Sequence, residues 1–347
     1  MRIRYQRLFA AAVLAGLLLP GAAQAANEVV FNVFPGPRHH TNVPFRAWAA
    51  EVEKVTSGRV HIKFLPTSAA PPPKQIDGVV SGQFDAAFIF NGFTAKRAVG
   101  PQFGMLPFLL NADAEIGSVA YWRTYQKFFA SKKEFDKIGI RILSMFHFPG
   151  NNIYSGTDTP IRSIADMKSR KMWALAGTPS HLLKNAGVNH VSGPAARVNE
   201  FTQTNVVDGL AGISFDGVRG FGALSFVKSA TILDDKLMAP TFLMFISEKK
   251  WQTFSPEDQK AITAISGEKV ARAVGAQSDV AEEVGRKALV DAKVEFIKGS
   301  PAFEAELKKA GQPIVTGWIA RAKKLGVDGQ EVISFYKAEV EKLKAGK

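Results

Sequence analysis

The chain contains few residues whose types and spacing could support catalysis. His39 and His40 are adjacent, and together with His147 they could bind a metal ion where loops meet. Ser214 follows Gly-Ile and precedes Phe-Asp, so the second glycine of a nucleophile elbow is missing. Adjacent histidines rarely point at one ion, and no third ligand motif accompanies them. We therefore predict no metal, no cofactor and no enzymatic activity.

Binding residues are more evident than catalytic ones. Four segments that follow predicted strands, at 35–42, 90–93, 146–152 and 213–216, are polar or aromatic. Ligands of open α/β sheets bind beyond the carboxyl ends of the strands, so we expect these segments to line one mostly apolar cleft. The candidate ligand-binding residues in them are His40, Phe90, Asn91, Phe148, Asn152, Phe215 and Asp216. Taken singly, Phe90 has an alternative interpretation as a core residue.

Composition excludes several classes of site. The 347 residues include 44 Lys and Arg, 31 Asp and Glu and no cysteine, with a net charge of +13. A disulfide, a thiolate nucleophile and a lipidated cysteine are therefore excluded. The lysines of the C-terminal third alternate with glutamates at helical spacing, which indicates solvated helix faces rather than a nucleic-acid surface.

The N-terminus has the pattern of a secretory signal peptide at 1–25. Three arginines precede an apolar run at 8–19, and Ala23-Gln24-Ala25 is a small-residue cleavage site. A membrane anchor is the alternative, but the run is shorter than the ~20 residues that span a bilayer. We expect export through the Sec pathway to the periplasm and a mature chain that is not membrane-embedded.

Strand and helix patterns alternate along the mature chain. Apolar strands are predicted at 29–34, 60–64, 84–90 and 140–148, and the last ends in a candidate hinge at 149–152. A second unit has strands near 171–175, 188–192 and 207–213, and the chain returns to the first unit at 242–247. Ser255 is a predicted N-cap of a helix that continues to about residue 293. This order indicates an α/β fold.

Several short segments, in this order, resemble the extracytoplasmic solute-binding proteins of tripartite ATP-independent periplasmic (TRAP) transporters. They are Thr159-Pro160-Ile161, Ile164-Ala165-Asp166-Met167-Lys168, Lys171-Met172-Trp173, Asn205-Val206-Val207-Asp208-Gly209, Ile246-Ser247-Glu248-Lys249-Lys250-Trp251 and Phe254 to Gln259.

The resemblance implies a two-lobed periplasmic binding protein with discontinuous domains and a long bridging helix. It implies lobe I at 26–150 plus about 239–275, and lobe II at 151–238 plus about 276–347. The implied partners are a small-molecule ligand and the membrane permease subunits of a TRAP transporter. We expect a monomer.

This chain departs from the family where the ligand is held. The arginine that grips the substrate carboxylate in the family falls on Trp173, and a frequent second pocket arginine falls on Asn152. A polar position becomes Gly212, and the last residue of the family's P-L-S-N falls on Asp216. Without either arginine a buried carboxylate needs another cation, whereas Trp173 offers an aromatic face. The alternatives are a core position for Trp173 and a helix N-cap for Asp216.

We therefore expect a neutral, cationic or aromatic ligand rather than a simple carboxylate. The alternative is an organic acid that is bound through Arg38, Arg97 or His40. A sensor-associated binding protein and a periplasmic enzyme are the other functions that the sequence leaves open.

Mass spectrometry of the periplasmic protein should give an N-terminus at Ala26 without an acyl chain. Recovery of the full-length chain in the membrane fraction would contradict the predicted localisation.

Overall fold

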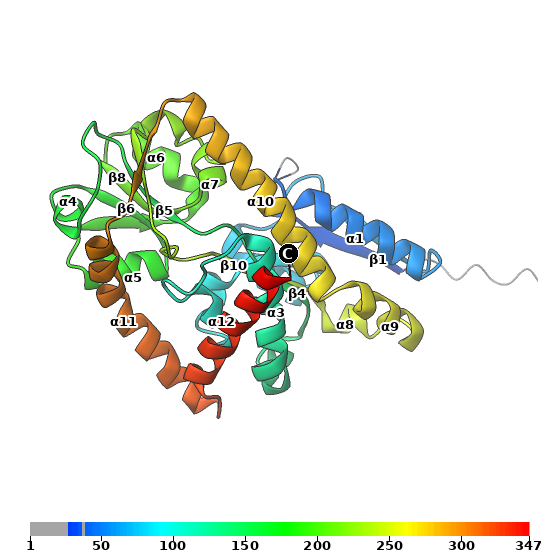
Figure 1. Ribbon diagram of the computed structural model, residues 1–347. Coiled ribbons are helices and arrows are strands. Elements are labelled where there is room, and N and C mark those ends of the chain that lie inside the picture. Colours follow the sequence, from blue (N-terminus) through cyan, green and yellow to red (C-terminus); the bar gives the residue numbers. More distant parts are fainter. Residues whose placement is uncertain (1–26, 37–38, 347) are drawn as a thin grey trace, which may run out of the picture.

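Two lobes, each built around one β-sheet, make up the protein (Figure 1). The computed structural model describes residues 27–36 and 39–346, so the predicted signal peptide lies outside the described residues. Helices pack on both faces of each sheet, and one long helix, α10 (Glu268–Asp291), runs from one lobe to the other. The predicted α/β fold with two lobes and a long bridging helix is confirmed.

The first sheet has the strand order β2-β1-β3-β10-β4. β1 is parallel to β2 and β3, whereas β10 is antiparallel to β3 and β4. Neighbouring residues of β3, such as Ala87 and Phe88, belong to separate hydrophobic cores on opposite faces, which explains the continuous apolar run of this strand. The strands are β1 (Asn27–Asn32), β2 (Val60–Phe64), β3 (Ala86–Phe90), β4 (Ile140–His147) and β10 (Thr241–Ser247).

The second sheet has the order β11-β9-β5-β8-β6-β7. It too is covered on both faces, because Met172 and Trp173 of β6 point into two different cores. The strands are β5 (Asn152–Ser155), β6 (Met172–Leu175), β7 (His190–Gly193), β8 (Gly209–Ile213), β9 (Ser229–Ile232) and β11 (Glu295–Lys298).

Most helices pack against only one of the two sheets. The first lobe has α1 (Asn42–Val55), α2 (Gln75–Val80), α3 (Ala114–Phe128), α8 (Glu248–Trp251) and α9 (Pro256–Ile265). The second lobe has α4 (Ile164–Lys168), α5 (Thr178–Asn185), α6 (Val198–Gln203) and α7 (Phe215–Gly220). α11 (Pro301–Lys324) packs against both lobes, because Phe303 is buried in a core of the second lobe and Trp318 in a core of the first. No helix among the described residues is both long and apolar enough to cross a membrane.

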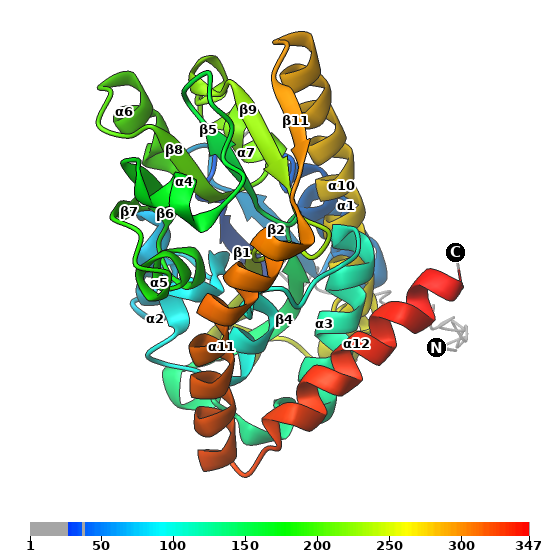
Figure 2. The same ribbon diagram turned by 60° about the vertical axis from the view of Figure 1, so that its left-hand side comes forward.

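The last helix, α12 (Gly329–Ala345), returns to the first lobe. It lies alongside α3 (Figure 2), and Tyr336 is buried in the same core as Tyr121. We keep the predicted division into lobes as a proposal with changes within 276–347, all of which was assigned to the second lobe: the start of this range up to Asp279, the end of α11 and the whole of α12 pack with the first lobe. The apolar residues of α12 pack against α3. No pattern in the sequence predicts this pairing of helices.

The bridging helix is attached to one helix N-terminus in each lobe by a carboxylate that accepts two backbone hydrogen bonds. Asp279 accepts hydrogen bonds from the first backbone N–H groups of α3, those of Ala114 and Glu115, at 2.7 and 2.9 Å. Three residues later, Glu282 accepts from the N–H groups that open α7, at 3.0 and 2.9 Å. Each carboxylate therefore satisfies backbone donors that have no partner within their own helix. We place the boundary between the lobes between Asp279 and Glu282.

Two glycines allow this close approach. A Cβ atom on Gly275 would overlap the carbonyl oxygen of Ala114, and one on Gly285 would overlap the backbone nitrogen of Asp216. The side-chain-free positions thus let α10 reach both helix N-termini.

The long helix predicted from Ser255 to about residue 293 is interrupted. α9 ends at Ile265 and α10 starts at Glu268, because Gly267 has a φ of +57°. The Gly267 N–H donates to the Leu143 carbonyl at 2.8 Å, and its carbonyl accepts from the Ser144 hydroxyl at 2.7 Å. Hydrogen bonds to β4 therefore replace helical hydrogen bonds at Gly267. The apolar periodicity of the sequence continues through this point, so it did not predict the break.

Substituting the contact glycines should destabilise the protein. Gly275→Ala and Gly285→Ala should each lower the free energy of unfolding by about 1–3 kcal/mol, because backbone atoms must move to admit the methyl group. Gly317→Ala in the middle of α11 is the matched control, since nothing lies near its Cβ position; it should stabilise by about 0.5–1 kcal/mol. Denaturant unfolding measures all three. Equal effects at the three glycines would contradict the close-packed bridging helix.

Candidate functional site

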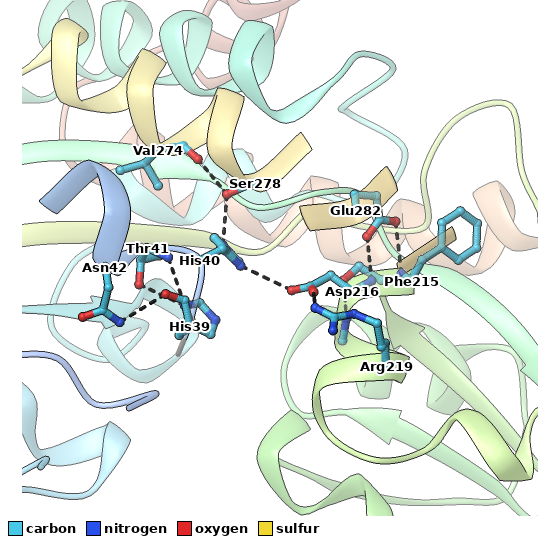
Figure 3. Close-up of polar contacts among 12 residues, drawn as sticks. His39, His40, Thr41, Asn42, Phe215, Asp216, Arg219, Val274, Ser278 and Glu282 are labelled. Carbon is cyan, nitrogen blue, oxygen red and sulfur yellow. Dashed lines mark hydrogen bonds and ion pairs between the residues drawn. The ribbon is translucent and has the colours of Figure 1, made fainter. Parts of the chain in front are cut away.

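A polar contact joins the two lobes. His40, in the loop before α1, places its Nδ1 atom 3.3 Å from Oδ2 of Asp216, which lies in the first turn of α7 (Figure 3). The side chain of His40 is 8% exposed and that of Asp216 is 17% exposed, so solvent screens the contact only weakly. Both residues were predicted as ligand-binding residues, and the structure brings them together.

Each partner of this contact is held by the bridging helix. The Ser278 hydroxyl lies 3.1 Å from Nε2 of His40, and the same hydroxyl lies 2.7 Å from the Val274 carbonyl oxygen. Glu282 holds Asp216 by its backbone N–H, and Arg219 donates to the Asp216 carboxylate at 3.1 Å (Figure 3). The side chains that meet between the lobes are therefore fixed from one helix.

Burial shapes the charges in this cluster. Burial raises the pKa of Glu282 to about 7, although the N–H groups of Asp216 and Phe215 act in the opposite direction. Burial also opposes ionisation of Asp216, but His40 and Arg219 hold the pKa of its carboxyl below the usual value. The pKa of His39 is lowered to about 3 by burial and then by His40, so His39 is neutral.

Asp216 is not the N-cap of α7. That position is occupied by Ser214, whose hydroxyl accepts from the Gly217 N–H at 3.1 Å. Ser214 therefore has a structural partner.

Aromatic side chains extend from this contact into the first lobe. Phe148 packs against the edge of His40 with ring centroids 4.7 Å apart, and against Phe242 at 4.0 Å. Phe242 in turn lies 5.6 Å from Phe90. Phe148 and Phe90 are half-buried, and Phe90 also packs against the core of the second lobe. The predicted Phe90, Phe148 and His40 thus form one aromatic row that reaches the second lobe.

Outside its long helices, the chain crosses between the lobes in two segments, 148–151 and 233–240, which we call the first and second crossovers. Three asparagines near these crossovers contain buried polar atoms that have no hydrogen-bond partner among the described residues. Asn152, which begins β5, is 1% exposed, and neither its Oδ1 nor its Nδ2 atom is paired. Asn151 leaves Nδ2 unpaired. Asn91 donates to Tyr121 and Thr241 at 2.9 and 3.0 Å but leaves Oδ1 unpaired. Unpaired buried polar atoms are uncommon in folded proteins, so these amides are suited to bind a ligand.

Trp173 and Phe215 lie deeper than expected. Trp173 is fully buried among core residues of the second lobe such as Leu210, and its indole N–H has no partner among the described residues. Phe215 packs against Tyr154 and Phe296 in the same lobe, and its backbone rather than its ring reaches Glu282. A ligand role for either ring stays a prediction.

Gly212 has a structural explanation. The β5–β8 register skips it, since Asn152 faces Ile213 and Ile153 faces Ala211, and its φ is +91°. Gly212 is thus the extra residue of a β-bulge, which favours glycine. A side chain there would also overlap Pro179.

Of the two arginines that could bind an anion instead, the structure describes Arg97 alone. Arg97 donates to Asp77 at 2.7 Å, and both side chains are 40% exposed. Arg38 lies outside the described residues. The sequence interpretation missed Ser278, Glu282 and Phe242. Polar residues on the buried stripe of the helix pattern at 268–291 were the available signal for the first two.

Known proteins match most of the chain. Residues 34–321 match the family described as bacterial extracellular solute-binding protein, family 7. A protein of Comamonas testosteroni named outer membrane transporter protein TsaT is 33% identical over 334 residues, covering 96% of this chain and 97% of the relative.

Two solved structures are similar. A TRAP periplasmic solute-binding protein of Bordetella bronchiseptica with bound (R)- and (S)-mandelate has a TM-score of 0.84 at 25% identity, with 91% of this chain and 99% of that chain covered. A marine metagenome TRAP solute-binding protein specific for aromatic acids, with 3-hydroxybenzoate, has a TM-score of 0.79 at 25% identity, with 91% and 98% covered.

The two-lobed fold and the family match define a solute-binding protein. The chain belongs to family 7 of the bacterial extracellular solute-binding proteins, and it is an extracytoplasmic solute-binding protein of the TRAP type. This family consists of solute-binding proteins rather than enzymes, and it is periplasmic.

The buried Glu282 should make stability depend on pH. Its pKa rises from 4.5 to about 7 on folding, so the folded state binds the proton more tightly than the unfolded state. As the pH rises from 4.5 through about 7, the wild type should therefore lose stability relative to Glu282→Gln. The free energy of unfolding should fall by up to about 3 kcal/mol more in the wild type than in the variant. Urea unfolding at several pH values measures the difference.

Glu283→Gln is the matched control, because Glu283 is exposed and pairs with Arg286. Its pH profile should run parallel to that of the wild type in this range. Parallel profiles for Glu282→Gln as well would contradict the burial of a titrating carboxyl at this position.

Proposed function

We propose that the protein captures a small aromatic solute between its lobes and delivers it to the membrane permease subunits of a TRAP transporter. The chain is exported with the signal peptide at 1–25 and acts in the periplasm after its removal. Closure of the lobes around the solute is the binding step, as in other hinged binding proteins.

One observation carries the proposal: an aromatic row lies close to unpaired buried amides at the crossovers between the lobes. Phe148, Phe90 and Phe242 supply ring faces and edges, against which an aromatic ligand gains area burial and favourable ring packing. The amides of Asn151 and Asn152 supply both donors and an acceptor without charge. A pocket of this kind orients a ring with one or two polar substituents.

The aromatic row and the neutral amides also limit how many acidic groups the ligand can carry. The described residues place no arginine against the aromatic row, and a buried carboxylate without a paired cation loses several kcal/mol of solvation. The solved relatives at 25% identity hold mandelate and 3-hydroxybenzoate, which are aromatic and have a single acidic group. We therefore propose a ligand with an aromatic ring and at most one acidic group, and we exclude dicarboxylates.

A thermal-shift screen tests the ligand class. 3-Hydroxybenzoate, (R)-mandelate and neutral phenols should stabilise the protein, by about 2.7 kcal/mol at a hundredfold excess over Kd. Succinate, sialic acid and pyruvate should give no shift. Small-angle scattering with a binding aromatic should show compaction of the two lobes. A tight dicarboxylate or aliphatic acid with no aromatic binder would overturn the proposal.

Variants locate the site. Phe148→Ala and Asn152→Ala should each weaken binding of the best aromatic by tenfold or more, because each removes a proposed contact (~1.4 kcal/mol). Phe335→Ala is the matched control: Phe335 is also half-buried but lies on α12, against Phe128. Arg97→Ala should bind as the wild type does. Loss of binding in Arg97→Ala with none in Phe148→Ala would favour the anion-binding alternative.

A further inference from the structure

One lysine of the second crossover lies across the first crossover. A Cβ atom on Gly150 would come within 2.2 Å of Cγ and 2.5 Å of Cβ of Lys236, so the absence of a side chain at Gly150 makes room for this lysine. The backbone of Lys236 is held from the first lobe. Its N–H donates to the Leu110 carbonyl at 3.3 Å, and its carbonyl accepts from the Phe108 N–H at 3.2 Å. Lys236 is therefore fixed where the two lobes join.

This position lies between the aromatic row and an unpaired amide. Two backbone hydrogen bonds, of 2.9 and 2.8 Å, join the two crossovers side by side. Along the first crossover, Gly150 is two residues from Phe148 on one side and two residues from Asn152 on the other. The stem of Lys236 thus crosses the chain midway between a ring of the row and the amide of Asn152, whose polar atoms have no partner among the described residues.

The ammonium group of Lys236 has no hydrogen-bond or ion-pair partner among the described residues, although the side chain is half-buried. Three carboxylates lie in its neighbourhood, those of Glu282, Asp234 and Glu304. Each of them is already engaged. Both oxygens of Glu282 accept backbone N–H groups of α7, Asp234 pairs with Lys298 at 3.4 Å, and Glu304 accepts from the Asp234 N–H at 2.7 Å. Within this described cluster, Lys236 is the cation that remains without a partner.

Burial acts against the charge of this lysine. It lowers the pKa of the Lys236 ammonium group, whereas the three neighbouring carboxylates act in the opposite direction. A half-buried ammonium without a partner has lost part of its hydration and has gained no hydrogen bond in return. An anion beside it would supply both the opposite charge and the missing acceptors, and hydrogen bonds between ionised groups are roughly twice as strong as neutral ones.

We propose that Lys236 binds a single carboxylate of the solute, with the Asn152 amide as a second donor and the solute's ring against Phe148. The assignment rests on the proposed function, because it gives the ring and the acidic group of one ligand to one site. The lysine stem is flexible and its ammonium group has three donors, so it can meet a carboxylate without the fixed bidentate geometry of an arginine.

The assignment also makes the ligand class narrower. The cation comes from the second crossover, whereas the family's arginine position in β6 holds Trp173. One unpartnered cation matches one carboxylate. An aromatic monocarboxylate should therefore bind more tightly than a neutral aromatic compound of the same shape.

Two ligands that differ in charge but hardly in shape test the assignment. They are 3-hydroxybenzoate and the neutral 3-hydroxybenzamide, and isothermal titration calorimetry measures both dissociation constants. In the wild type the acid should bind about tenfold more tightly than the amide, or better. In Lys236→Met, which keeps an apolar stem, the acid should weaken by about tenfold or more while the amide changes by less than about threefold. Lys236→Arg should keep the preference for the acid.

Lys298→Met is the matched control. Lys298 also lies near Asp234, but it is exposed and paired with that carboxylate. Both ligands should bind this variant as they bind the wild type. A variant that has lost its fold would lose the amide as well as the acid, so retained amide binding shows that the site of Lys236→Met is intact.

The outcomes separate the two proposals. Equal affinities of acid and amide in the wild type, or an acid that binds Lys236→Met unchanged, would overturn the role of Lys236 and leave the aromatic site in place. If the screen yields only an acid without a ring, the proposed function fails, and the role of Lys236 is kept only if Lys236→Met weakens that acid by about tenfold or more. A screen that yields no acid at all overturns it.

Discussion

The structure depends on how one helix meets the N-termini of two others. Backbone N–H groups at a helix start have no partner within that helix, and they attract negative charge. α10 presents Asp279 to α3 and Glu282 to α7, three residues apart, with Gly275 and Gly285 admitting the close backbone approach on either side. A helix of each lobe is thereby attached to the same bridging helix, at carboxylates that lie three residues apart.

This anchoring explains why a single side-chain contact can matter between lobes of this size. Each lobe has its own cores, which are joined at a few residues such as Met105 and Phe90, so most apolar burial takes place within a lobe. Opening and closing then differ by few contacts, and equilibria of this kind are shifted by a few kcal/mol. A weakly screened contact such as His40–Asp216 is on that scale, as is the binding of a small solute.

The sequence predicted the elements better than it predicted their contacts. The apolar run at 84–90 and the return at 242–247 identified central strands, because burial on both faces leaves a direct composition signal. The helix break at Gly267 was missed, since the hydrogen bonds that cause it come from Leu143 and Ser144, more than a hundred residues earlier. The location of α12 was missed for the same reason. The loops of His40 and Phe148 were predicted to meet and do so, because β1 and β4 end at the same edge of the first sheet. Asp216 follows β8 of the second sheet and meets His40 through the packing of the two lobes.

A residue that aligns with a charged binding residue of the family need not lie in the binding cleft. Trp173 occupies the place of an arginine in the family's sequence pattern, yet its ring is fully buried in the core of the second lobe. Large apolar side chains are generally buried, so the ring lies in the core. The polar and charged groups that lie between the lobes include His40, Asp216 and Arg219, and Asp216 contacts both of the others. Under the proposed function, these charged groups contact each other across the lobes, and rings and amides are the groups expected to recognise the solute. If the proposed aromatic site is right, the protein discriminates by shape and aromatic area more than by the number of acidic groups, because ring faces and neutral amides gain nothing from a second carboxylate.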